Sequence, residues 1–363
     1  MSMSSDKKIV YICHTFYHAY VALMKELLLP KEERGRATLL LSTMSNDFGS
    51  MKDRAEASGV FRDVYFFDER PPESSEEVMR YKRDRGNLLS NLRQRIRYTK
   101  LLGKLQEGQL PVDLSAYSGI YVFCDSDPIG YYLNYKKLHY HALEDGLNSG
   151  KLDNQAMLSN RGAWGVKKFL AKLGLIFIEC GYSRYCIDYE VNDLSANYMP
   201  PKCAFERPFL GMWEQLKEED HEILARVFIE DFDRLKAELA ASELPGVMIL
   251  TEPLCDLETR RRLFADIIEK YKDGHRIIIK PHPRDVLDYR ATFPEVCVMS
   301  GRFPMEVIND IPGLSVDKLV SVITQVDNVR FAKECIYLGE GFLDAYEDPA
   351  VHRKMELLKA GKN

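Results

Sequence analysis

The sequence predicts an α/β protein with two domains, each a doubly wound sheet covered by helices. The chain has 363 residues, which is more than one ordinary domain needs and enough for two. Short apolar segments alternate with helical patterns along most of its length, as they do in α/β layers. Hydrophobic residues make up 45% of the chain and charged residues 29%, which is typical of a globular protein with a sizeable core.

The first domain is expected over residues 1–200. A run of branched apolar residues at 9–13 predicts a buried strand, and the loop after it opens into a helix at 21–28. A polar, basic helical stretch is expected at about 76–106. The other strands of this domain are predicted at residues 37–42, 64–67, 120–124 and 138–143.

The second domain is expected over residues 201–345, followed by a C-terminal helix at 346–363. The prolines within residues 195–208 predict a linker, and one long amphipathic helix is expected at 214–241. Asp256 stands where it would cap the next helix. The strands of this domain are predicted at residues 247–250, 276–279, 297–299 and 319–323.

Charge and cysteine usage narrow the class of protein. A formal net charge of −5 argues against a dedicated nucleic-acid binder. The 8 cysteines form no CxxC pair, so we expect free thiols in a reducing cytoplasm. The polar N-terminus lacks the apolar stretch of a signal peptide, and no later run is long enough to span a bilayer. A cytoplasmic protein is expected, with any membrane contact peripheral and at the inner face.

A histidine stands between two prolines after the strand predicted at 276–279. The motif is Lys280-Pro281-His282-Pro283-Arg284. Pro281 and Pro283 restrict the backbone on both sides of the histidine. A rigid imidazole flanked by cationic side chains suits a group that holds a phosphate or a leaving oxygen. The alternative is a stiff turn with an incidental surface histidine.

A second polar motif, Glu144-Asp145-Gly146, follows the strand predicted at 138–143. Adjacent carboxylates repel each other, which raises the proton affinity of one of them. A carboxylate at the end of a strand can accept a proton from a substrate hydroxyl. Gly146 would let the backbone turn tightly. The alternative is an ordinary acidic surface turn.

Two later motifs in the second domain suit a nucleotide. Glu306 lies at the start of a helix, where a carboxylate favours the helix dipole and is also able to bind ribose hydroxyls. Ser321 and Thr324 end the strand predicted at 319–323. Their hydroxyls, with backbone amides at the start of a following helix, would form an anion site.

Polar residues after two strands of the first domain are candidates for the acceptor side. His14, Thr15 and Tyr17 follow the first strand, where loops commonly line a cleft, although Thr15 would also serve as a helix cap. Asp125 and Asp127 form a DxD pattern that is able to bind a divalent metal. A strand-end turn is the preferred interpretation, so Asp125 is assigned to the acceptor side and no metal is expected.

A basic stretch at residues 80–104 contains nine Lys or Arg residues and one acid, Asp84. Leu88, Leu92, Ile96 and Leu101 would give it an apolar face. Such a helix is able to dock on an anionic membrane or glycolipid, and it is equally compatible with a solvated helix face.

In order and combination, these motifs resemble the bacterial sialyltransferases of glycosyltransferase family 52, the lipooligosaccharide sialyltransferase group. The opening VYICHTFYHAYVAL at residues 10–23 is similar to that family's first strand and loop. The resemblance runs from about residue 9 to about residue 330. One departure is VITQ at residues 322–325, where the family usually has adjacent serines.

The resemblance implies a GT-B fold, in which two Rossmann-like domains face each other across a cleft. It also implies a CMP-activated sialic acid or related nonulosonic acid as donor, inversion at the anomeric carbon, and neither metal nor cofactor. The acceptor would be a saccharide hydroxyl on a cell-surface glycan such as lipooligosaccharide or capsule.

The resemblance also implies roles for single residues. Asp145 resembles the general base, and His282 resembles the group that stabilises the departing phosphate. The implied donor contacts are the ribose for Glu306, the cytosine for the backbone near Lys280, and the phosphate for Thr324 with Ser321.

Two alternatives remain open. A glycerophosphotransferase or another GT-B nucleotide-donor transferase also carries such a lysine-proline-histidine-proline run, but should show a further serine pair near the C-terminus, which is missing here. A non-catalytic nucleotide- or glycan-binding protein is favoured by Thr324 in place of the serine pair, and disfavoured by the presence of Asp145 and His282. A homodimer is compatible with the sequence.

Overall fold

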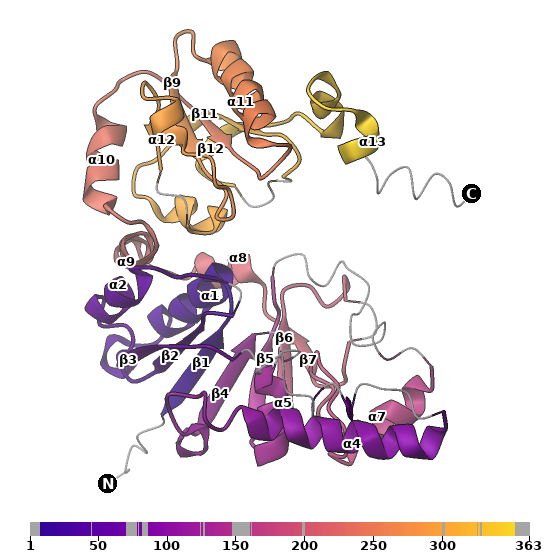
Figure 1. Cartoon of the computed structure of the whole chain (residues 1–363). Helices are drawn as coiled ribbons and strands as arrows, with labels where there is room; N and C mark the ends of the chain where they lie inside the picture. Colours follow the sequence, from indigo (N-terminus) through magenta and orange to yellow (C-terminus); the bar gives the residue numbers. More distant parts are fainter. Residues whose placement is uncertain are drawn as a thin grey trace. The chain divides into compact units, whose positions relative to one another are not determined.

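The computed structural model describes residues 8–44, 46–69, 78, 80–81, 86–123, 125, 128–146, 160, 162–197, 200–299, 302–324, 326 and 329–352. The chain divides into two compact units, Met1–Leu216 and Lys217–Asn363 (Figure 1). Each unit contains one sheet whose strand pairings are all parallel.

The first unit is built on a seven-stranded sheet in the order β3-β2-β1-β4-β5-β6-β7. The order reverses between β1 and β4, so the carboxyl ends of these two strands form the topological switch point of the sheet. The strands are β1 Ile9–Cys13, β2 Thr38–Ser42, β3 Asp63–Phe67, β4 Gly119–Phe123, β5 Tyr140–Leu143, β6 Cys186–Val191 and β7 Ala204–Glu206.

Helix α1 (Phe16–Leu27) follows β1 directly, and all but one of its residues are buried. The Thr15 side chain accepts a hydrogen bond from the His18 backbone N–H, so the predicted helix cap is confirmed. Because of this cap, α1 begins at residue 16 and not at residue 21 as expected from the sequence. The other helical segments of this unit are η1 Lys31–Glu33, α2 Met51–Ala57, α4 Leu88–Leu105, η2 Leu114–Ala116, α5 Pro128–Lys136, α7 Trp164–Lys172 and α8 Phe209–Trp213.

The second unit is built on a five-stranded sheet in the order β10-β9-β8-β11-β12. Its strands are β8 Gly246–Leu250, β9 Arg276–Lys280, β10 Cys297–Val298, β11 Val316–Ser321 and β12 Ala332–Tyr337. Asp256 caps α11 through the N–H groups of Glu258 and Thr259, as predicted. The helical segments are α9 Glu218–Phe228, α10 Phe232–Ala240, α11 Leu257–Tyr271, α12 Tyr289–Thr292, η4 Met305–Asp310, η5 Glu340–Ala345 and α13 Pro349–His352.

Three features differ from the sequence-based expectation. The expected linker at 195–208 contains β7, which pairs with β6, and the units divide after Leu216 and not at residue 200. The single helix expected at 214–241 is two helices, because Asp231 has a left-handed backbone with φ of 54°. The expected C-terminal helix begins with α13, and residues 353–363 lie outside the described residues.

Within the described residues, no helix combines the length and the apolar character needed to cross a bilayer.

Candidate active site

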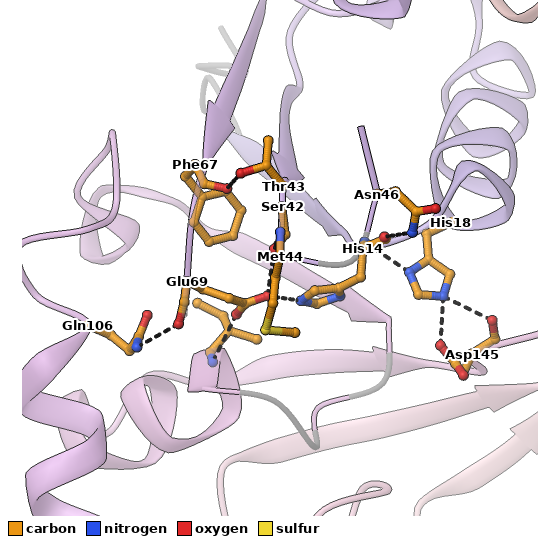
Figure 2. Close-up of polar contacts among 11 residues, drawn as sticks. His14, His18, Ser42, Thr43, Met44, Asn46, Phe67, Glu69, Gln106 and Asp145 are labelled. Atoms are coloured by element: carbon orange, nitrogen blue, oxygen red, sulfur yellow. Dashed lines mark hydrogen bonds and ion pairs between the residues drawn. The ribbon is translucent and has the colours of Figure 1, made fainter. Parts of the chain in front are cut away.

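The candidate residues of the first unit lie at the carboxyl edge of its sheet. His14 follows β1, and Asp145 lies two residues after the end of β5. The buried side chain of His18, from the first turn of α1, lies between them (Figure 2). His18 was not among the candidates chosen from the sequence.

Hydrogen bonds determine the tautomer of His18. Its Nδ1 accepts the backbone N–H of His14 at 3.1 Å, so Nδ1 carries no proton. Its Nε2 therefore carries the proton and donates it to Asp145, 2.9 Å from Oδ1 and 2.9 Å from the backbone oxygen. The imidazole ring also stacks on Phe123 with 4.6 Å between the ring centroids. His18 is thus a fixed donor directed at the carboxylate of Asp145.

The electrostatics of this pair favour an ionised carboxylate beside a neutral imidazole. The hydrogen bond from His18 lowers the pKa of Asp145, and burial opposes it. Burial lowers the pKa of His18, so the ring is neutral at physiological pH. The Asp145 side chain is 54% exposed, so solvent reaches the carboxylate that His18 holds.

The expected effect of the neighbouring carboxylate is wrong for Asp145, because the pKa of Asp145 is lowered and not raised. Glu144 is turned away from it: its Oε2 accepts the backbone N–H of Asn192 at 2.6 Å, beyond the end of β6. Gly146 does not adopt the left-handed backbone conformation that would require glycine.

His14 is buried and does not line an acceptor surface. Its ring forms an ion pair with Glu69, which also accepts the Ser42 hydroxyl at 2.8 Å. Asn46 Nδ2 donates to the backbone oxygen of His14 at 2.8 Å (Figure 2). These contacts fix the segment after β1, and with it the backbone N–H that sets the tautomer of His18.

Asp125, another candidate of the first unit, is held inside that unit. Asp125 is 1% exposed, and its carboxylate accepts the Tyr140 hydroxyl and the backbone N–H groups of Cys180 and Gly181. Burial raises the pKa of Asp125 to about 6. In the described residues Asp125 is thus engaged inside the first unit, and residues 126 and 127 of the DxD pattern lie outside the described residues. Tyr17 lies beside the ring of Phe209.

In the second unit, hydrogen bonds fix both the backbone and the ring of His282. Its N–H donates to Thr251 Oγ1 at 3.1 Å, and its Nδ1 accepts the backbone N–H of Arg284 at 3.1 Å. In the neutral ring, Nε2 therefore carries the proton. Among the described residues, no hydrogen-bond partner meets this nitrogen.

Burial lowers the pKa of His282, and the charges of Arg284 and Lys280 act in the same direction. The imidazole is therefore neutral, with one N–H available to a ligand.

A buried ion pair anchors the turn that carries His282. Asp285 receives Arg260 Nη1 at 2.6 Å, the Thr251 hydroxyl at 3.0 Å and the Tyr289 hydroxyl at 2.8 Å. The backbone N–H of Asp285 in turn donates to the carbonyl of His282 at 2.9 Å. The stiffness expected from the two prolines thus has a second source, which is this set of long-range contacts.

Lys280 and Glu306 lie close enough for the charge of each to shift the pKa of the other. Burial lowers the pKa of Lys280 to about 7, and Glu306 opposes this shift. Burial likewise raises the pKa of Glu306, which lies in the first turn of η4. Lys280 Nζ donates to the carbonyl of Pro281 at 2.7 Å and lies 4.2 Å from the centroid of the Phe303 ring.

The expected anion site after β11 differs from the prediction. The described residues directly after Ser321 form a bend and not a helix, and the Ser321 hydroxyl donates to the carbonyl of Thr324 at 2.8 Å. The backbone N–H groups of Ile323 and Thr324 donate to the carboxylate of Glu252. These backbone N–H groups do bind an anion, which is the carboxylate of Glu252 from the same chain.

Among the described residues, no three His, Cys, Asp or Glu side chains are grouped so that they would hold a metal ion.

The residues missed from the sequence are those whose role depends on distant partners. His18 lies one helical turn after His14, and a histidine in the first turn behind a strand was a usable signal. Thr251 and Glu252 follow β8 directly, and polar residues at the carboxyl end of a strand are the signal that indicates them.

Comparisons with known proteins agree with this architecture. The model of glycosyltransferase family 52 matches residues 113–324. A curated relative, an uncharacterized protein of Haemophilus influenzae, is 33% identical over 98 residues, which are 26% of this chain and 31% of the relative. The chain thus spans about a third of the length of that relative.

Two solved structures resemble the chain across both units. An alpha/beta-galactoside alpha-2,3-sialyltransferase of Photobacterium phosphoreum has a TM-score of 0.50 and 11% identity, covering 91% of this chain and 90% of the other. A 2,6-sialyltransferase of a Photobacterium species, in a ternary complex with the donor product CMP and the acceptor substrate lactose, has a TM-score of 0.53 and 11% identity, covering 91% and 71%. At this identity the likeness shows the fold, and it confirms the predicted α/β class of GT-B type with two Rossmann-like domains.

Proposed function

The chain belongs to glycosyltransferase family 52, and from this premise we propose that it transfers sialic acid, or a related nonulosonic acid, from a CMP-activated donor to a saccharide hydroxyl. The observation that carries the proposal is a complementary pair of groups. One unit holds an ionised, exposed carboxylate at Asp145, and the other holds a neutral histidine with an available N–H at His282. A base for the acceptor and a donor to the leaving group are what an inverting transfer needs.

Asp145 is the proposed general base. As the acceptor oxygen attacks the anomeric carbon, its proton becomes strongly acidic and passes to the Asp145 carboxylate. A carboxylate with a lowered pKa suffices for this late proton transfer and is fully ionised beforehand. The His18 N–H holds one carboxylate oxygen in place throughout.

His282 is the proposed partner of the departing phosphate. The bond between the anomeric carbon and the phosphate oxygen breaks as the new glycosidic bond forms on the opposite face, so the configuration inverts. The His282 Nε2–H donates to the phosphate oxygen on which negative charge develops. CMP carries a single phosphate, so an imidazole and a few amides or hydroxyls are enough to stabilise it without a metal.

The donor contacts remain those implied by the family. Glu306 would bind the ribose hydroxyls, and the backbone near Lys280, at the end of β9, would meet the cytosine. Ser321 and Thr324 belong to the segment proposed for the phosphate. Support comes from the solved 2,6-sialyltransferase of similar fold in complex with CMP and lactose, which suggests a nucleotide-sugar donor and a saccharide acceptor.

The proposed acceptor is a saccharide of a cell-surface glycan, presented at an anionic membrane. Helix α4 covers most of the basic stretch at 80–104. It contains five Lys or Arg residues and no acid, and it exposes Leu88 and Leu89 at its start. Helix α7, which packs with α4 in one apolar cluster, contains three lysines and exposes Val166 and Phe169. Cationic and apolar side chains together suit peripheral membrane contact.

Ligand-dependent thermal stability tests the donor. CMP, with EDTA present, is expected to raise the melting temperature, because a ligand at a hundredfold excess over its dissociation constant adds about 2.7 kcal/mol to the free energy of unfolding. UDP and GDP at the same concentration serve as controls and should have little effect. An equal response to all three nucleotides, or none to CMP, would contradict a CMP donor.

A further inference from the structure

We propose that Glu252 is an internal occupant of the donor-phosphate position, and that CMP binds by displacing its carboxylate from the N–H groups of Ile323 and Thr324. The inference rests on the proposed CMP donor. It adds a residue that sets the affinity for the phosphate-bearing part of the donor.

The position of Glu252 follows from the sheet. Strand β8 pairs with β9 on one side and with β11 on the other. Thr251 and Glu252 leave the carboxyl end of β8, so they lie between the segments that follow β9 and β11. Thr251 Oγ1 accepts the N–H of His282 at 3.1 Å, and the next residue, Glu252, accepts the N–H of Ile323 at 3.0 Å. Glu252 thus directly follows Thr251, the residue that binds the backbone of the proposed leaving-group histidine, His282.

The contacts of Glu252 are those of an anion in a cradle of amides. The N–H groups of two successive residues, Ile323 and Thr324, converge on one carboxylate. Convergent backbone N–H groups bind carboxylate and phosphate oxygens alike. A phosphate oxygen is therefore able to replace the carboxylate with no change in the donors.

The exchange replaces one anion with another at the same two backbone amides. Glu252 is 3% exposed, and within the described residues no ion pair with Lys or Arg is found for it. Displacement by phosphate would release the carboxylate towards water, while the neutral His282 supplies the phosphate with an additional donor.

Occupancy by Glu252 also accounts for the replacement of the serine pair. The family usually places adjacent serines at this motif, whereas here Val322 is apolar and the Ser321 hydroxyl is engaged by the carbonyl of Thr324. The backbone N–H groups are the remaining phosphate donors, and Glu252 holds them in the unliganded chain.

Calorimetric titration with CMP and with cytidine separates phosphate binding from nucleoside binding. For Glu252→Gln and Glu252→Ala, the affinity for CMP is expected to rise, by about tenfold in the alanine variant. The reason is that each variant lacks the charged carboxylate that competes with phosphate for the two backbone N–H groups. The affinity for cytidine should change less than about twofold. Glu269 is an exposed acid of α11 that pairs with Lys272, so Glu269→Gln is the matched control and should change neither affinity.

Parallel weakening of CMP and cytidine, or unchanged CMP affinity in both variants, would show that Glu252 only ties the strand ends together and would overturn the inference. Glu252→Gln keeps an acceptor for the two amides, so it preserves the test if the alanine variant does not fold. Failure of the wild-type chain to bind either CMP or cytidine would instead overturn the proposed function, and the inference with it.

Discussion

Two histidines are held in the same tautomer by backbone N–H groups, and they have different proposed tasks. His18 accepts the N–H of His14 and directs its Nε2–H at Asp145. His282 accepts the N–H of Arg284 and leaves its Nε2–H without a partner among the described residues. Burial lowers the pKa of both, so each is a neutral donor at physiological pH. The first orients the base, and the second is available to the leaving group.

Replacing His18 with phenylalanine tests its role as a positioning residue. The hydrogen bond from His18 is the largest cause of the lowered pKa of Asp145, so its loss should raise that pKa. The acid limb of the pH profile of kcat/KM is then expected to move to higher pH in His18→Phe. His18→Gln, whose amide is able to donate to Asp145, should move it back in part. Lower activity with an unchanged acid limb would mean that His18 acts only through packing.

The sequence identified Asp145 and His282 correctly as polar residues that follow strands, because that rule depends only on local order. It could not show which side chains turn inward. His14 and Asp125 also follow strands, but distant partners hold them inside: Glu69 for His14, and the segment at Cys180 for Asp125. Glu252 shows the same limit, since its partners lie about seventy residues away in the sequence.

At the scale of elements, the strands that the sequence predicts are rich in apolar residues, and most of them are largely buried. Strands β1 and β8, and the central residues of β2, are short apolar runs, which are typical of buried parallel strands. Strands β6 and β12 were missed because most of their residues are partly or fully exposed and several are charged. The break at Asp231 was missed because the apolar periodicity continues through it, while the left-handed backbone depends on local packing.

The buried ion pair between Arg260 of α11 and Asp285, in the turn that carries His282, is expected to contribute to stability. Arg260→Met should lower the free energy of unfolding by about 3 kcal/mol or more, because it leaves the Asp285 carboxylate buried without its cation. Urea denaturation measures this change. Arg226→Met, which removes an exposed arginine paired with Glu222, is the control and should shift the midpoint little. Equal shifts for the two variants would refute the anchoring role.

Helix α1 contains a buried acid that makes stability depend on pH. Burial raises the pKa of Glu26 to about 7, and the hydrogen bond from the Tyr11 hydroxyl opposes this only in part. The folded chain therefore keeps a proton that the unfolded chain has lost, and stability falls as pH rises from about 4.5 to about 7. Glu26→Gln should raise the melting temperature more at pH 8 than at pH 5. An equal change at both pH values would contradict the raised pKa.

At the scale of the whole molecule, each unit contributes one half of the proposed chemistry. The first sheet presents the base at the carboxyl edge of β5, and the second presents the leaving-group donor and the nucleotide-binding segments at the carboxyl edges of β8, β9 and β11. Neither half accounts for glycosyl transfer alone. The central claim is therefore that Asp145 and His282 act in one reaction on a CMP-activated donor.

Sugar transfer from CMP-sialic acid to lactose, measured as CMP release and as sialylated product with EDTA present, tests this claim most directly. The wild-type chain should form product whose anomeric configuration is inverted. Asp145→Asn, which still accepts the His18 hydrogen bond, should lower the rate by at least about a hundredfold with unchanged CMP binding. Full transfer by Asp145→Asn, or CMP binding by the wild-type chain without any transfer or hydrolysis of the donor, would contradict the account.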